Sequence, residues 1–193
     1  MSKKRLLFIS SRPLYPIIGG DQIRTVQQLD YLKDQFDVDV LYISSDNKDI
    51  KYLDNYGGIG NIFRFQVPKW KSILQTLRFL INDKPLQVNY FFNRAIQKKI
   101  NNIITEYDCV FCNNIRTAEY VRSKTGIIKF LDFVDAISMN YDKARYQATG
   151  LRKIMYSLDY KRCRVYEQQC LEYFDSCAVI SDIDKNYILS WKK

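Results

Sequence analysis

Six short hydrophobic runs recur along the chain, separated by longer segments of helical periodicity. The first run, Leu6–Ile9, is continuously apolar, which is typical of a strand buried on both faces of a parallel sheet. Further runs lie at residues 38–43, 62–67, 108–112, 127–133 and 177–180. The sequence therefore predicts six strands.

Helical patterns fill the intervals between these runs. After the first run, one helical stripe is formed by Thr25, Leu29, Leu32 and Phe36. We expect further helices near residues 49–56, 70–81, 92–103, 116–122, 136–148, 151–174 and 182–193. Strands that alternate with helices at this spacing form right-handed βαβ units. The predicted fold is one α/β domain over residues 1–193, a Rossmann-like, doubly wound, mainly parallel sheet with helices on both faces.

The segment from Arg12 to Arg24 joins the first strand to the first helix and contains the pair Gly19-Gly20. Adjacent glycines let backbone N–H groups approach a ligand, and a helix start adds unpaired donors with partial positive charge. The segment lacks G-x-G-x-x-G, and no Gly-Lys-Ser/Thr follows, so it is neither a dinucleotide fingerprint nor a P-loop. It indicates either an anion-binding edge or a simple turn.

Polar side chains also follow the later strands, at the edge where doubly wound sheets bind ligands. These candidates are Asn113, Asn114 and Arg116 after the fourth strand, Asp132 and Asp135 after the fifth, and Ser181 and Asp182 after the sixth. Asp135 is placed either to accept a proton from a substrate or to cap the following helix. Farther along, Glu167 lies beside an apolar stripe, and we interpret it as a buried carboxylate paired with an arginine.

The amino-acid composition excludes some kinds of catalytic and metal site. The chain has no histidine, so a histidine base, a histidine-activated nucleophile and a histidine metal site are excluded. Five scattered cysteines and an N-terminal apolar run too short for a leader favour a reducing cytosol. Cys109 and Cys112 form C-x-x-C inside a strand rather than at a helix start, so we interpret them as core thiols.

The net charge of +9 favours an anionic partner such as a phosphate ester or a membrane surface. Nucleic acid is not expected, because the basic residues are dispersed and no RNA- or DNA-binding signature is present. No apolar run approaches the length of a membrane span. One helix does suit a membrane interface, with an apolar stripe that includes Trp70 and basic positions at Lys69, Lys71 and Arg78. We favour the alternative that this stripe covers the sheet.

Several of these segments together resemble the N-terminal half of a family 4 glycosyltransferase of GT-B fold, as in bacterial exopolysaccharide clusters. They are the Arg12 to Arg24 segment, Lys84-Pro85-Leu86-Gln87-Val88 with Tyr90-Phe91, the helix at 118–121, Asp132 to Asp135 with Ser138, Tyr166-Glu167, and Val179-Ile180-Ser181. The resemblance extends over essentially the whole chain and rests on their order and spacing.

The resemblance implies specific roles. Gly19, Gly20 and Arg24 would face the donor phosphates or sugar, and Asp135, with Asp132 as a weaker candidate, would act on the acceptor hydroxyl. Asn113, Asn114 and Arg116 would lie on the acceptor side. No cofactor or metal is expected beyond the nucleotide-sugar co-substrate.

In this family a second Rossmann-like domain carries the donor site, and it is absent from these 193 residues. The expected function is therefore the acceptor-binding domain of a retaining glycosyltransferase, which moves a sugar to a glycan or lipid-linked acceptor in surface polysaccharide synthesis. It would be cytoplasmic, either free or peripheral on the inner membrane face, and inactive alone. The alternative is a non-catalytic basic module that docks on an anionic membrane or a partner subunit.

Overall fold

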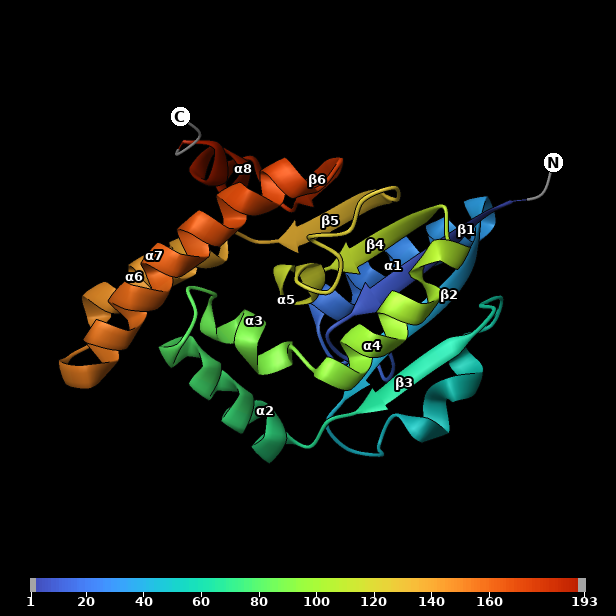
Figure 1. Ribbon diagram of the computed structural model, residues 1–193, viewed down its shortest axis with the longest axis horizontal. Coiled ribbons are helices and arrows are strands. Elements are labelled where there is room, and N and C mark those ends of the chain that lie inside the picture. The colour runs from blue at the N-terminus through green and yellow to red at the C-terminus, as the bar shows by residue number, and fades with distance from the viewer. Residues whose placement is uncertain (1–2, 191–193) are drawn as a thin grey trace.

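The computed structural model describes residues 3–190, and six parallel strands form one sheet through its centre (Figure 1). The strands are β1 (Lys4–Ser10), β2 (Phe36–Ser44), β3 (Ile62–Gln66), β4 (Cys109–Asn113), β5 (Ile128–Val134) and β6 (Ser176–Val179). Their order is β3-β2-β1-β4-β5-β6. From β1 the chain builds outward to β3, then crosses to β4 and builds the other half. The predicted doubly wound α/β fold is confirmed.

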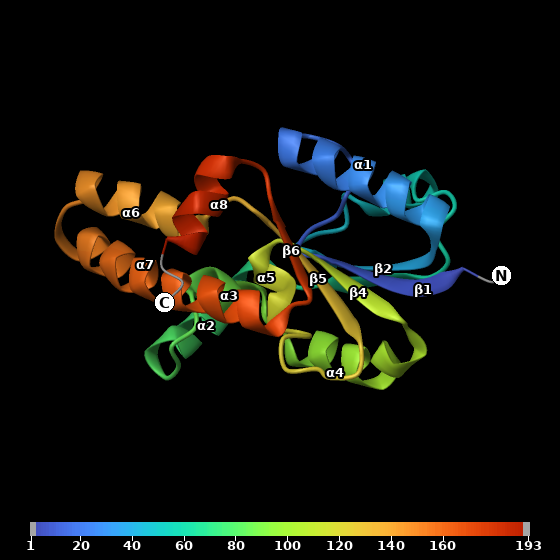
Figure 2. The ribbon, with the colours of Figure 1, turned by 90° about the horizontal axis from the view of Figure 1, so that it is seen from above.

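Helices cover both faces of this sheet. They are α1 (Gly20–Gln35), α2 (Lys69–Thr76), α3 (Leu86–Phe91), α4 (Arg94–Ile103), α5 (Ile115–Ala118), α6 (Ile137–Gln147), α7 (Gly150–Tyr173) and α8 (Asp182–Leu189), with 3-10 turns η1 (Ile50–Asn55), η2 (Leu77–Leu80) and η3 (Ile104–Glu106). Figure 2 shows α1 on one face and α4 on the other, with α6 and α7 projecting from one end as a hairpin.

The hydrophobic core lies in two layers, one on each face of the sheet. Successive residues of β1 serve opposite layers, because side chains alternate along a strand. Leu6 and Phe8 pack in the layer under α1, whereas Leu7 and Ile9 pack in the layer that includes α4 and α7. All four are fully buried. This explains why the first hydrophobic run is continuous.

Several predicted elements differ in the structure. The helix expected near 49–56 is the 3-10 turn η1, and the helix expected near 116–122 is the shorter α5. The helix expected over 92–103 begins at Arg94, because the chain is extended at Phe92 and Asn93 and the Asn93 side chain caps α4 by accepting from Ala95 N–H at 2.8 Å. The separate helix α3, which precedes it, was not predicted. The helix expected over 70–81 changes to 3-10 geometry at Leu77. The last helix ends at Leu189, and its predicted end at Lys193 lies outside the described residues.

Candidate functional site

The carboxyl ends of β1 and β4 meet at the point where the sheet changes direction. Ser10 is opposite Asn113 in the register, and Asn113 is opposite Asp132 of β5. The connections that leave these ends run to opposite faces, which opens a crevice at such a switch point. The structure therefore brings the loops after β1, β4 and β5 together at one edge.

The loop after β1 is fixed by side chains from elsewhere. Leu14 is buried, and its N–H donates to the Tyr56 hydroxyl at 3.0 Å. Gln22, in the first turn of α1, accepts from Ile18 N–H at 2.9 Å and donates to the Pro13 carbonyl at 3.0 Å. These bonds hold the loop against α1 and leave Ile18 exposed at the edge.

Gly19 and Gly20 begin α1 at this edge, as the sequence indicates. Gly19 is the N-cap in an extended conformation, and no side chain caps the helix. Neither glycine has the positive φ that would require glycine in a turn. A Cβ built on Gly20 would meet no atom within 4 Å. The space beside Gly20 is therefore open, at the start of α1.

Arg24, which is half-buried one turn into α1, forms an ion pair with the buried Asp132. The guanidinium lies 2.7 Å from Asp132 Oδ2, and the carboxylate is fully buried. The same carboxylate accepts from Gln28 Nε2 at 2.7 Å and from Val134 N–H at 3.0 Å. Both oxygens of Asp132 are thus occupied by protein donors. Arg24, expected beside a donor phosphate, is directed to this carboxylate.

Strained backbone marks the ends of β4 and β5. Asn114 has φ 74° and Val134 has φ 69°. Positive φ is unfavourable for a β-branched residue and persists only where the surrounding structure enforces it, often at functional sites. At Val134 the enforcing contacts are its bond to Asp132 and the bond from Ile180 N–H to its carbonyl. The strain turns the chain so that Asp135 leaves the strand at the edge.

The other residues predicted after β4 lie close to this turn. Asn113 is buried and donates to Thr25 of α1 at 3.2 Å. Asn114 Oδ1 accepts from Arg116 N–H at 3.2 Å, which caps the short helix α5. Arg116 itself reaches past α5, and its Nε donates to Gln87 Oε1 of α3 at 2.8 Å. Asn113 and Asn114 therefore stabilise the loop after β4, while the Arg116 side chain extends away from it toward α3.

Asp135 and Arg116 line the same hollow, of about 310 Å³, together with Gln87, Asn140, Tyr141 and Tyr156. Asp135 is half-buried and accepts from Asn140 Nδ2 at 2.6 Å. Burial lowers the pKa of Arg116, and the nearby charge of Asp135 partly offsets that effect. A carboxylate and a guanidinium therefore face one polar hollow at the carboxyl edge.

Glu167 is buried beside this hollow, but its partner is not an arginine as expected. It accepts from Ser138 N–H at 2.9 Å and from the Ser138 hydroxyl, at the first turn of α6. Burial, with a smaller contribution from the charge of Asp135, raises the pKa of Glu167 to about 7. Backbone amides replace the expected arginine because α6 begins directly against α7.

The candidate residues after β6, Ser181 and Asp182, lie at the start of α8. Ser181 Oγ accepts from Asp184 N–H at 3.1 Å and caps the helix, while Asp182 is exposed. A separate hollow of about 400 Å³ lies here, lined by β6 and α8. Asp184, which the sequence did not single out, accepts from Ala136 N–H at 2.9 Å. The α8 start is thereby joined to the turn that carries Asp135.

The expectation that the 70–81 stripe covers the sheet is wrong, because its apolar residues face solvent. Trp70 is 59% exposed, and the other exposed members are Ile73, Leu74, Leu77, Leu80 and Ile81. The buried side of α2 packs against α3 instead. Lys69 and Lys71 are exposed, whereas Arg78 is half-buried and donates to the Phe92 carbonyl at 3.1 Å.

Within residues 3–190, no helix is long and apolar enough to cross a membrane.

The cysteines are core thiols, as predicted. Cys109 and Cys112 are buried in β4, and burial raises the pKa of Cys112 to about 12. A thiol with so high a pKa is protonated at neutral pH and is a poor nucleophile.

Sequence patterns missed two residues of the edge. Arg12 lies within the Arg12 to Arg24 segment, but its charge carried no separate signal. Burial and the charge of Arg116 lower its pKa, and it forms an ion pair with Asp21. Asp159 of α7 is fully buried and accepts from Leu86 N–H at 2.8 Å. Asp159 could have been found from the sequence, because it is a carboxylate beside the apolar stripe of the helix that became α7.

Comparison with known proteins supports the fold. No family model and no curated protein matches this sequence. A solved structure described as a UDP-N-acetylglucosamine 2-epimerase from Listeria monocytogenes superposes over 100% of this chain and 43% of its own, with TM-score 0.55 and 12% identity. TcCGT1 in complex with UDP matches 77% of this chain and 33% of its own, with TM-score 0.45 and 14% identity. The chain thus spans less than half the length of either protein.

Proposed function

We propose that this chain is the acceptor-side domain of a retaining glycosyltransferase of GT-B fold. It would act with a second Rossmann-like domain that binds a nucleotide-sugar, in the synthesis of a surface polysaccharide. The observation that carries the proposal is the polar hollow at the carboxyl edge, which Asp135 and Arg116 both line beside two strained strand ends. The fold shared with a protein described as a UDP-sugar epimerase adds support.

Asp135 is the group that would act on the acceptor. Among residues 3–190, Asn140 is the hydrogen-bond donor to Asp135 and binds its Oδ2, so the other oxygen can bind an acceptor hydroxyl and take its proton as transfer proceeds. Glu167 would position it through the start of α6.

The start of α1 would face the donor across the cleft. The positive end of the helix dipole favours the negative charge that develops on a leaving diphosphate. Arg24 and Asp132 would position this helix start rather than touch substrate, because their charges satisfy each other inside the protein. No metal is needed in this scheme, since amides and guanidinium groups supply the positive charge.

Calorimetric titration of nucleotide-sugars into the chain tests the proposal that the donor binds mainly to the second domain. We expect binding no tighter than the millimolar range, because the proposed donor site lies mainly on the other domain. Nanomolar binding of any nucleotide-sugar to this chain would overturn the two-domain proposal.

A second candidate function is docking on an anionic membrane, and the exposed α2 stripe favours it. Lysines beside exposed apolar side chains are typical of helices that lie in a membrane interface. We expect the chain to sediment with vesicles that contain anionic lipid, and the double variant Lys69→Glu, Lys71→Glu to lose most of this binding. The matched control is Arg94→Glu with Lys98→Glu, which reverses two exposed charges on α4. Equal losses in both variants would indicate a general charge effect and contradict docking through α2.

A further inference from the structure

The turn that carries Asp135 is held by residues from the junction of β6 and α8. Asp135 lies between two peptide units, and a hydrogen bond fixes each of them. Ile180 N–H donates to the Val134 carbonyl at 2.9 Å, and Ala136 N–H donates to Asp184 Oδ1 at 2.9 Å. Because a peptide unit is planar, fixing the units on both sides of a residue fixes its φ and ψ. These two contacts therefore set the direction in which the Asp135 side chain leaves the backbone.

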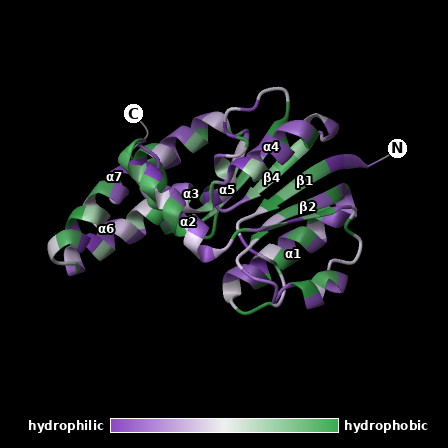
Figure 3. Cartoon of the chain, turned by 60° about the horizontal axis from the view of Figure 1, so that its bottom comes forward, coloured by the Kyte–Doolittle hydropathy of each residue, from purple (hydrophilic) through white to green (hydrophobic). Residues whose placement is uncertain are grey.

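Apolar packing gives this turn little support from α6, the helix that follows it. The buried residues of α6 are Ile137 and Ser138, at its start. Figure 3 shows hydrophilic stretches along the projecting α6–α7 hairpin, whereas the strands labelled there are largely hydrophobic. Val134 has φ 69°, a conformation that a β-branched residue keeps only where neighbouring contacts enforce it. The polar contacts from β6 and α8 are therefore needed to hold the turn.

The Asp184 carboxylate has a contact beyond the capping of its own helix. Ser181 is the N-cap of α8, and Asp184 is the third residue of that helix. In a capping box, the carboxylate at this position accepts from the N–H of the cap residue. In α8, Oδ1 of Asp184 accepts from Ala136 N–H, 48 residues away in the sequence, while the Ser181 hydroxyl donates to Oδ2. Both oxygens are engaged and Asp184 is buried, so the orientation of the carboxylate is fixed.

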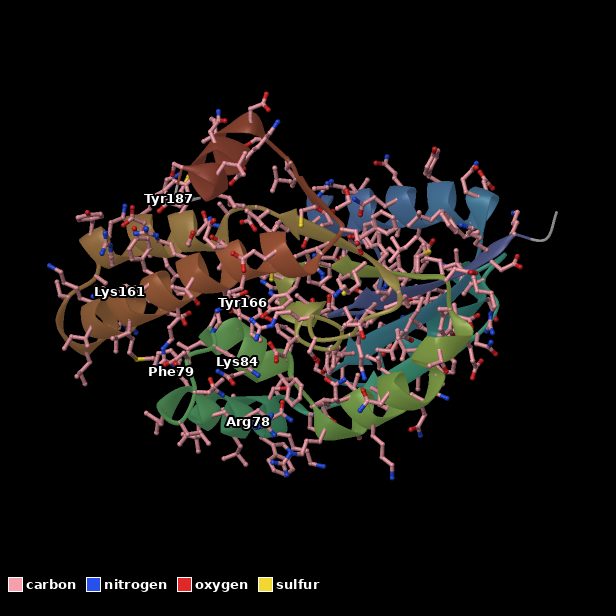
Figure 4. The ribbon with its side chains drawn as sticks, turned by 45° about the horizontal axis from the view of Figure 1, so that its top comes forward. Arg78, Phe79, Lys84, Lys161, Tyr166 and Tyr187 are labelled. Atoms are coloured by element: carbon pink, nitrogen blue, oxygen red, sulfur yellow. The ribbon has the colours of Figure 1, made fainter. Side chains whose placement is uncertain are left out.

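Helix α8 is itself fixed against the α6–α7 hairpin. The Tyr187 hydroxyl donates to Asp142 Oδ2 of α6 at 3.4 Å, and the Gln168 side chain of α7 donates to the Ile188 carbonyl. Figure 4 shows Tyr187 on α8, beside the hairpin. Ile188 is buried in the core layer that includes α7. Asp184 is therefore presented to the turn from a helix that is held in place on its own account.

We propose that Asp184 is a positioning residue for Asp135. Its carboxylate fixes the peptide unit that follows Asp135 and so directs the Asp135 side chain into the polar hollow, where that side chain accepts from Asn140. The inference rests on the proposed glycosyl transfer, in which Asp135 takes the proton of the acceptor hydroxyl. Asp184 acts through the turn and does not itself contact the substrate.

NMR of the intact chain tests this role through two signals. The hydrogen-exchange rate of Ala136 N–H reports its bond to Asp184, and the side-chain amide of Asn140 reports the position of the Asp135 carboxylate. Asp184→Ala should accelerate Ala136 exchange by about tenfold or more, the factor that corresponds to one lost hydrogen bond, and should shift the Asn140 signal. Asp184→Asn keeps an oxygen that can accept from Ala136, so both signals should return toward their wild-type values.

Two control variants separate positioning from the capping of α8. Ser181→Ala removes the N-cap hydroxyl but leaves the Asp184 carboxylate, and Asp182→Ala removes an exposed carboxylate from the same turn of helix. Neither should shift the Asn140 side-chain signal. If circular dichroism shows that Asp184→Ala does not fold, Asp184→Ser replaces it, because a serine hydroxyl is too short to reach Ala136. An unchanged Asn140 signal in the folded variant, or an equal shift in Ser181→Ala, would overturn the proposal.

Transfer kinetics of the native protein give a readout that a purely structural role would not change. Asp184→Ala should lower kcat by about tenfold or more and leave the KM for the acceptor within about twofold, because it misplaces the base. In an Asp135→Asn background the same substitution should cause no further loss of kcat, since Asp184 acts through Asp135. An equal fall in kcat in both backgrounds would contradict the positioning role.

The outcomes separate this inference from the proposed function. If the native protein transfers sugar and its kcat depends on Asp135 but not on Asp184, the positioning role fails and glycosyl transfer stands. If no sugar is transferred while the Asn140 signal responds to Asp184→Ala as expected, the contact between α8 and the Asp135 turn stands and the enzymatic role fails.

Discussion

Asp132 and Asp135 are three residues apart in the sequence, but their surroundings in the structure are opposite. Asp132 is fully buried, with Arg24, Gln28 and a backbone amide on its oxygens. Asp135 faces a hollow and has one oxygen engaged. The strained turn at Val134 separates them. The first carboxylate therefore contributes to stability, and the second is available for chemistry.

Substitution of each aspartate by asparagine should separate these roles. Asp132→Asn leaves Arg24 without its counter-charge inside the protein, so we expect the free energy of unfolding to fall by about 3 kcal/mol. Asp135→Asn should change it by less than about 0.5 kcal/mol. Urea denaturation of the two variants measures both values. Similar small losses would show that Asp132 is not a structural partner.

The buried carboxyl of Glu167 should make stability depend on pH. Because burial raises its folded pKa from 4.5 to about 7, the folded state holds the proton more tightly than the unfolded chain. This contribution is complete below pH 4.5 and is lost as the pH rises toward 7. Between pH 4.5 and 7, the wild type should therefore lose stability relative to Glu167→Gln.

Urea denaturation at several pH values measures this difference. Glu172→Gln, at an exposed position of the same helix, is the matched control and should show no such trend. A difference that is constant from pH 4.5 to 7 would contradict a raised pKa at Glu167.

At the scale of elements, periodicity predicted which segments form helices but not what each helix covers. All six strands were predicted, because a buried run of apolar residues identifies a central strand by itself. The 70–81 stripe has the same periodicity as a sheet-covering helix, yet it faces solvent. The pairing of Arg24 with Asp132 spans 108 residues, and no local pattern encodes it. Partners of this kind depend on the tertiary arrangement.

The exposed stripe of α2 should tolerate polar substitution. The double variant Ile73→Ser, Leu77→Ser should change the free energy of unfolding by less than about 0.5 kcal/mol, because both side chains are already in water. Val88→Ser, at a fully buried position of the adjacent α3, should cost more than about 2 kcal/mol. Thermal and urea denaturation give both numbers. If the double variant lost as much stability as Val88→Ser, the α2 stripe would have to be buried.

At the scale of the whole molecule, the sheet order places the candidate groups that follow β1, β4 and β5 along one edge. The loops after β1, β4 and β5 meet there because β1 and β4 are neighbours at the switch point. The polar hollow lined by Arg116 and Asp135 opens beside this edge, between α3, α6 and α7. In the proposed function this edge would form one wall of an active site, and the donor-binding domain would supply the other.

Transfer of a labelled sugar by the native protein tests the acceptor-domain proposal most directly. The protein would be captured from its source cells with an antibody to this chain, then supplied with labelled nucleotide-sugars and extracted acceptors. We expect transfer, and a fall in kcat of at least about a hundredfold in Asp135→Asn, the magnitude typical of losing a general base. Absence of transfer from every nucleotide-sugar, or wild-type transfer by Asp135→Asn, would contradict the account.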